Sequence, residues 1–134
     1  MSAPKTAWIS FSRQEKKPWG DTRVWHSNGS IHGKLITLLA GNRTSLKYHR
    51  VKNEVFYIVS GSVRVVFGDS KTWKSSEKHP YQTKVLKMTD VFHVQSECPY
   101  RLEALEDSVI VEIGDRADDY PVILEDDYGR AKKE

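Results

Sequence analysis

The sequence predicts an all-β protein, built as a single antiparallel barrel or sandwich of two sheets. Apolar and polar side chains alternate in short runs such as 62–67 and 108–113, which is the period of a strand with one buried face. Turn-forming pairs, for example at 41–42 and 68–69, recur every eight to fifteen residues. That spacing is typical of small sandwiches and barrels. No run of ten or more residues has a convincing helical period outside short turns in the tail.

Five strands can be placed in order along the chain. Each run is rich in β-branched or aromatic residues and is bounded by Gly, Asn, Asp or Ser. The runs cover residues 34–40, 54–59, 63–67, 91–95 and 108–113. The polar segment 69–82, between the third run and the fourth, is expected to be a long hairpin excursion.

Length and composition indicate one globular domain over residues 1–134, with its core at about 17–130. The chain is 38% hydrophobic and 29% charged, so it is predicted to fold. No apolar run approaches the roughly 20 residues of a membrane-spanning helix, and the N-terminus lacks the apolar core of a signal peptide. With a single cysteine, Cys98, these features favour a cytoplasmic protein without a membrane partner.

The charge pattern argues against nucleic acid as a partner. The net charge is only +3, and basic residues are interleaved with acidic ones along most of the chain. The exception is a lysine-rich stretch at 71–87, which lacks the aromatic interleaving and the strong positive charge of nucleic-acid surfaces. We interpret it as a solvated hairpin.

The most informative motif lies between Gly41 and Gly61. Its spacing is a glycine, five residues, Lys47-x-His49, four residues, Glu54, six residues and a second glycine. This pattern resembles the first conserved motif of the cupin superfamily. In that motif the position of Lys47 is also a histidine. The resemblance implies a cupin jelly roll whose interior His and Glu side chains bind a metal ion.

Four further segments make the resemblance more specific. They are Lys-Pro-Trp-Gly-Asp at 17–21, Ser-Leu-Lys-Tyr-His at 45–49, Tyr-Arg-Leu-Glu-Ala at 100–104 and Glu-Asp-Asp-Tyr-Gly-Arg at 125–130. In this order they resemble the C-terminal cupin domain of type II phosphomannose isomerases, which is often fused to a mannose-1-phosphate guanylyltransferase. The resemblance implies a metal-dependent mannose-6-phosphate isomerase acting on a sugar phosphate.

The chain departs from that family at two of the four expected metal ligands. His49 and Glu54 are retained, but Lys47 and Tyr100 stand where the family has Gln and His. A protonated lysine repels a cation, and tyrosine loses its proton only near pH ~10. Unless His93 or Glu112 supplies a third ligand, the site is degenerate. We therefore expect no cofactor, or otherwise a divalent ion such as zinc, manganese, iron or nickel.

Three functions remain open for these residues. His49, Tyr100 and Lys47 could be catalytic in a sugar-phosphate isomerase. Some metal-free cupins, the deoxythymidine diphosphate-sugar epimerases and ketoisomerases, resemble this chain in using a His base opposite a Tyr acid. Alternatively, the chain is a non-catalytic small-molecule-binding or structural cupin. An open pocket around Lys47 would favour binding or catalysis. A Lys47–Glu54 ion pair that closes the pocket would instead favour a cupin that has lost its functional site.

The expected ligand is a phosphorylated or nucleotide-linked sugar in the barrel interior. Lys47, Arg101, Tyr128 and Arg130 are candidate contacts, because cationic side chains bind phosphate through charge-assisted hydrogen bonds. A salt bridge to nearby carboxylates is an equally good interpretation for both arginines.

A homodimer is the expected assembly. In the run 54–59, Glu54, Phe56 and Ile58 should face inward, which leaves an apolar outer set at 55, 57 and 59. Such a face is expected to be covered by the N-terminal segment or by a second subunit.

Overall fold

The computed structural model describes residues 3–129 and has eleven strands, with no helix in that range. In chain order the strands are β1 (Arg13–Lys17), β2 (Gly20–Asn28), β3 (Ile31–Leu38), β4 (Leu46–His49), β5 (Glu54–Ser60), β6 (Ser62–Phe67), β7 (Gln82–Lys87), β8 (Val91–Val94), β9 (Tyr100–Ala104), β10 (Ser108–Asp115) and β11 (Pro121–Glu125). No helix in the described part of the chain could span a membrane.

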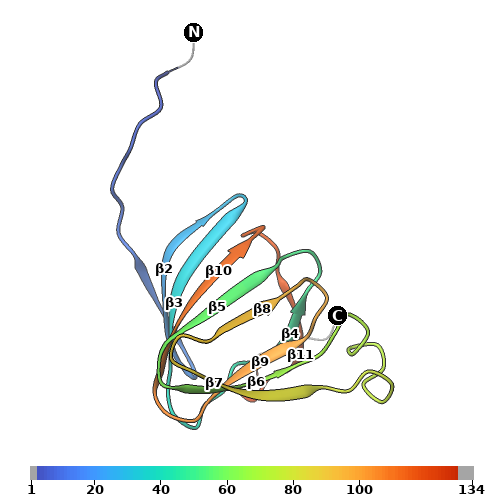
Figure 1. The fold of residues 1–134 in the computed structure, drawn as a ribbon. Helices are drawn as coiled ribbons and strands as arrows, with labels where there is room; N and C mark the ends of the chain where they lie inside the picture. The colour runs from blue at the N-terminus through green and yellow to red at the C-terminus, as the bar shows by residue number, and fades with distance from the viewer. Residues whose placement is uncertain (1–2, 130–134) are drawn as a thin grey trace.

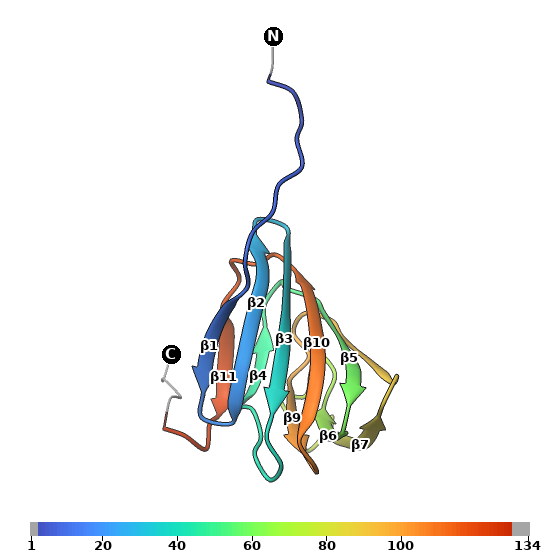
Figure 2. The ribbon, with the colours of Figure 1, turned by 90° about the vertical axis from the view of Figure 1, so that its left-hand side faces the viewer.

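The strands form two antiparallel sheets that face each other, as Figures 1 and 2 show. The first has six strands in the order β1-β2-β3-β10-β5-β8, and the second has five in the order β11-β4-β9-β6-β7. The predicted all-β jelly roll of two sheets is therefore confirmed. The sheets stay separate hydrogen-bonded units, so the molecule is a sandwich with an interior space rather than a fully closed barrel.

The five predicted strands correspond to β3, β5, β6, β8 and β10, with small shifts at their ends. The five runs do not cover β1, β2, β4, β7, β9 or β11. Strand β2 is interrupted by a bulge between Val24 and His26, which breaks the alternation that identifies a strand. Strand β7 is exposed along most of its length and therefore has little apolar pattern to detect.

The core lies between the sheets, where the alternating side chains of both inner faces meet. Phe56, Ile58, Ile110 and Leu102 are each at most 2% exposed. On β5 the inward set is Glu54, Phe56 and Ile58, as the alternation predicted. The polar segment after β6 is a series of turns that ends where β7 begins at Gln82.

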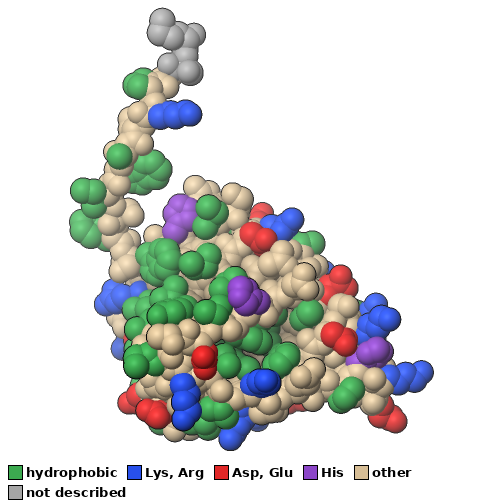
Figure 3. Space-filling view, viewed as in Figure 1, with side chains coloured by type: hydrophobic (Ala, Val, Ile, Leu, Met, Phe, Trp, Pro, Cys, Tyr) green, Lys and Arg blue, Asp and Glu red, His purple; other side chains and the backbone are tan. Residues whose placement is uncertain are grey.

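The outer face of the six-stranded sheet is unusually apolar. Tyr57 on β5 is 41% exposed, and Ile113 on the neighbouring strand β10 is 47% exposed. Ile113 is paired with Val55, which lies two residues before Tyr57 on β5. Figure 3 shows hydrophobic side chains spread over this face. The segment 3–12 runs away from the sheets in Figures 1 and 2 and leaves Phe11 93% exposed. Within one chain, that segment does not cover the outer face.

Candidate functional site

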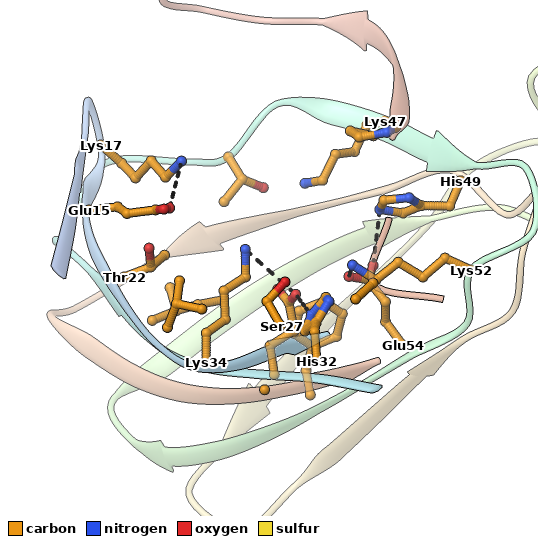
Figure 4. A pocket seen from close by; sticks show the side chains of 18 of the residues that line it. Glu15, Lys17, Thr22, Ser27, His32, Lys34, Lys47, His49, Lys52 and Glu54 are labelled. Carbon is orange, nitrogen blue, oxygen red and sulfur yellow. Dashed lines mark hydrogen bonds and ion pairs between the residues drawn. The ribbon is translucent and has the colours of Figure 1, made fainter. Parts of the chain in front are cut away.

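A cavity of about 420 Å³ lies between the two sheets. The five-stranded sheet contributes Lys47, His49 and Tyr100 to its wall. The opposite wall comes from the six-stranded sheet and carries His32, Lys34, Glu54 and Glu112. Figure 4 shows Lys34 and Lys47 reaching into the space from these two walls.

The five-stranded wall is set by strand register. Lys47 and His49 lie two residues apart on β4, so both side chains leave the same face. Lys47 is directly opposite Tyr100 on β9. The structure therefore brings Lys47, His49, Glu54 and Tyr100 to one cavity, as the sequence predicted from the resemblance.

The six-stranded wall owes its arrangement to a glycine. In the register, Gly114 on β10 is paired with His32 on β3 and with Glu54 on β5. A Cβ at Gly114 would come within 2.8 Å of Lys52 Cε and 3.2 Å of His32 Cε1. Because position 114 has no side chain, His32, Glu54 and the next inward residue of β10, Glu112, can converge.

Two buried carboxylates meet in this wall, with different environments. Burial and the charge of Glu112 raise the pKa of Glu54 to about 7. Burial alone would also raise the pKa of Glu112, but Lys34, His32 and a hydrogen bond from Glu54 lower it below its usual value. His32 Nε2 is 2.5 Å from Glu112 Oε2, and Lys34 Nζ is 3.7 Å from the same oxygen. Glu112 therefore ionises more readily than Glu54.

Glu54 is also in contact with the five-stranded wall. The Tyr100 hydroxyl donates a hydrogen bond to Glu54 Oε1. Burial, followed by the charge of Glu54, raises the pKa of Tyr100 well above its usual value, so the phenol stays neutral. Lys47 Nζ is 4.8 Å from the centre of the Tyr100 ring, within the range of a cation–π contact.

His49 lies beside Glu54 as a buried, neutral imidazole. Its Nε2 is 3.6 Å from Glu54 Oε1, and its Nδ1 is 3.5 Å from Asp119 Oδ2. Burial, Lys52 and Lys47 lower the pKa of His49 to about 4. Nδ1 has no hydrogen-bond partner among the described residues, because the contact to Asp119 is too long.

The metal set implied by the resemblance does not fit these residues. A cation held by His49 and Glu54 would lie close to the ammonium group of Lys47, which stands at a ligand position. Tyr100 is a neutral hydrogen-bond donor here rather than a phenolate. His93, one of the two residues considered as a third ligand, is paired with Val55 in the register and does not line the cavity.

Sequence reasoning missed His32, Lys34, Lys52 and Asp119 as cavity residues. A signal existed for the first two, because they share one face of β3 with Ile36 and Leu38, at every second position. Asp119 gave no local signal. It follows β10 in a turn and accepts hydrogen bonds from the backbone of residues 51 and 52.

The other predicted ligand contacts lie elsewhere. Arg101 points away from the cavity, because it follows the inward Tyr100 on β9. Its Nε donates to the Thr44 carbonyl, and its guanidinium lies 3.4 Å from Glu125 and 3.5 Å from Asp127. Tyr128 packs against the core and does not line the cavity. Arg130 lies outside the described residues.

Glu54 has a salt bridge from Lys52, and Lys47 Nζ lies over the Tyr100 ring. Both lysines line the cavity.

Comparison with solved structures supports the fold. An oxalate decarboxylase from Bacillus subtilis superposes with a TM-score of 0.70 and 19% identity over 88% of this chain, which spans 31% of that chain. Another match is the same enzyme described with Mn(II) centres, at a TM-score of 0.70 and 20% identity over 87% of this chain and 31% of that chain. KdgF from Halomonas sp. gives a TM-score of 0.66 at 15% identity over 81% of this chain and 94% of its own. At these identities the likeness shows the fold alone.

Sequence comparison identifies the family. No curated protein sequence matches the chain. The family model for the C-terminal domain of mannose-6-phosphate isomerase matches residues 7–111, which include Lys47, Glu54 and Tyr100 and end one residue before Glu112. The chain therefore belongs to the mannose-6-phosphate isomerase C-terminal family of cupins.

Proposed function

We propose that this protein binds a phosphorylated or nucleotide-linked sugar in the cavity between its sheets and handles it as a sugar-phosphate isomerase does. The observation that carries the proposal is the presence of four lysines, Lys17, Lys34, Lys47 and Lys52, around one interior cavity of about 420 Å³. Cavities of this size suit small-molecule ligands.

The charge distribution supports an anionic ligand. Lys17, Lys34 and Lys52 are each within 4 Å of a carboxylate, and Lys47 extends from the opposite wall with its ammonium group near an aromatic ring. An ammonium group in that position can form charge-assisted hydrogen bonds with a phosphate or carboxylate. The family, whose model is named for an isomerase of a sugar phosphate, favours the phosphate.

The cavity also contains groups suited to proton transfer. Aldose–ketose isomerisation moves a proton between neighbouring carbons through an intermediate with negative charge on oxygen. His49 and Glu54 are adjacent in the cavity and could exchange protons with a bound sugar. The Lys47 ammonium would stabilise the developing negative charge on the ligand.

The alternatives make different demands on the same residues. A His/Tyr epimerase would need the Tyr100 hydroxyl as its acid, and that hydroxyl is engaged by Glu54. A binding protein without catalysis would use the lysines alone. Binding without turnover of any bound sugar phosphate would favour this second alternative.

A thermal-shift screen of sugar phosphates, nucleotide sugars and neutral sugars tests the proposal. Anionic compounds should stabilise the parent protein, and Lys47→Met should reduce the shift. Lys84→Met, which changes an exposed lysine on β7, is the matched control. The proposal fails if no anionic compound stabilises the parent, or if the two variants respond alike.

We further propose that the protein is a cytoplasmic homodimer. A second copy is the occupant we assign to the apolar outer face around Tyr57, because that surface is large and exposed. The exposed segment 3–12, with Trp8, Ile9 and Phe11, offers a complementary apolar element on every copy. The cytoplasmic location rests on the single cysteine, Cys98.

A further inference from the structure

We infer that His32, Glu54 and Glu112 form a binding site for a divalent transition-metal ion, displaced from the ligand positions that the family uses. Only Glu54 is common to the two sets. The inference depends on the proposed function in one respect, namely that the ion would share its cavity with the sugar ligand.

The geometry of the three side chains supports a common ligand. One atom from each of the three lies within 4.8 Å of the corresponding atoms of the others, and all three residues are buried. They come from three adjacent strands, β3, β5 and β10, whose register is fixed by hydrogen bonding. Gly114 leaves the space between His32 and Glu54 free of a side chain.

The ligand chemistry indicates which ions would bind. One imidazole nitrogen with two carboxylates suits Zn²⁺, Mn²⁺ or Fe²⁺ better than Mg²⁺, which prefers oxygen ligands alone. Ligands on one ion lie about 2.0–2.2 Å from it, so neighbouring donor atoms are about 3 Å apart. His32 Nε2 and Glu112 Oε2, now 2.5 Å apart, would therefore have to separate slightly to admit the ion.

Electrostatics explains why the site is compatible with nearby lysines. Each carboxylate has two oxygens and about four lone-pair positions. Lys52 contacts Glu54 through Oε2, while Tyr100 donates to Oε1. Lys34 contacts Glu112 at 3.7 Å, a weak ion pair. The lysines lower the affinity for a cation but leave lone pairs for it. When an ion neutralises the two carboxylates, Lys34 and Lys52 become more available to an anionic sugar.

Three protein ligands would leave open coordination positions, which is the pattern of a catalytic site rather than a structural one. These positions would face the cavity that Lys47 enters from the other wall. A bound sugar could therefore contact the ion and the lysine together.

The test is titration calorimetry of chelator-treated protein with Zn²⁺ and with Mn²⁺, without any sugar. We expect one ion per chain, with Mg²⁺ as the control ion that binds more weakly. His32→Gln and Glu112→Gln should each weaken metal binding at least about tenfold. Removing a residue that only hydrogen-bonds a metal ligand already lowers metal affinity about 10- to 100-fold, and removing a ligand itself should lower it at least as much. His49→Gln should change affinity less than about threefold, since His49 is absent from the set. Thermal unfolding of each variant checks that it is folded.

Two results would overturn the inference. The first is that the folded parent binds neither Zn²⁺ nor Mn²⁺. The second is that His49→Gln abolishes binding while His32→Gln does not, which would return the ion to the family positions. Sugar-phosphate binding measured separately in chelator keeps the two proposals distinct. Loss of metal binding with retained anion binding contradicts only this inference, whereas the reverse contradicts only the proposed function.

Discussion

The two walls of the cavity differ in the charge that they present. The five-stranded sheet contributes Lys47, neutral His49 and neutral Tyr100, whereas the six-stranded sheet contributes the carboxyl groups of Glu54 and Glu112. The resemblance implies a family site in which ligands from both walls surround one metal ion. Lys47 and Tyr100, where the resemblance implies Gln and His, make the first wall of this chain cationic and aromatic.

The comparison teaches that the two halves of a binding site can change separately. Lys47 places a positive charge on one wall, but an ammonium group cannot coordinate several ligands as a metal ion does. The carboxylates of the other wall still require cations, because buried charges are costly without partners. Lys34 and Lys52 meet that need, and His32 Nε2 lies within hydrogen-bond distance of Glu112.

The largest effect should follow from breaking the acidic wall. Glu112→Gln removes the charge that pairs with His32 and Lys34 and leaves both groups poorly satisfied in a buried site. We expect the free energy of unfolding to fall by about 2 kcal/mol, measured by urea denaturation. Glu103→Gln, in a partly exposed pair with Arg64, is the control and should cost less than about 1 kcal/mol. Equal losses of unfolding free energy in the two variants would mean that the buried pairs of Glu112 stabilise the fold no more than the partly exposed pair of Glu103.

A slightly smaller loss is expected from filling the gap in that wall. In Gly114→Ala the new methyl group would press on Lys52 Cε and on the Asn53 carbonyl oxygen. The expected cost is about 1–2 kcal/mol, in the range for overpacking. Denaturation of Gly114→Ala, Lys52→Ala and the double variant gives the coupling energy. Additive effects would show that the contact with Lys52 does not cause the loss.

Restoring the first wall should recreate the family site. The double variant Lys47→Gln with Tyr100→His rebuilds the family's ligand set beside His49 and Glu54, and each single change should do less. We expect at least about tenfold tighter binding of Zn²⁺ or Mn²⁺ than in the parent, equivalent to about 1.4 kcal/mol. Titration calorimetry checks this. No gain in the double variant would mean that the geometry of the cavity, as well as its ligands, has diverged.

The smallest effect on the cavity is expected from the outer face. Tyr57 is on the opposite side of β5 from Glu54, so Tyr57→Lys should break the proposed dimer while sugar-phosphate affinity changes less than about twofold. Size-exclusion chromatography with light scattering reports the mass. A monomeric parent would contradict the dimer, and a dimer that survives Tyr57→Lys would place its interface elsewhere.

Sequence reasoning predicted the fold and one wall better than the other. Strand β5 was readable because it is a short run of β-branched and aromatic residues that ends at a Ser-Gly turn, and the convergence of Lys47, His49, Glu54 and Tyr100 followed from the resemblance. The contribution of β3 was missed because Gly33 and the polar His32 obscure the start of that strand. The role of Gly114 depends on pairing among three strands far apart in sequence, which local patterns do not specify. Arg101 was assigned to the ligand because its charge was clear, but its direction depends on its place after Tyr100.

The central claim is that Lys47 now provides, on the five-stranded wall, the positive charge that holds an anionic sugar. Titration calorimetry of mannose 6-phosphate into chelator-treated protein tests it most directly, with the parent compared to Lys47→Met and Lys84→Met. We predict that Lys47→Met weakens binding about 10-fold or more, the value of a charge-assisted hydrogen bond, while Lys84→Met equals the parent. Equal affinity of Lys47→Met and the parent, or no binding of mannose 6-phosphate to the parent, would contradict the account.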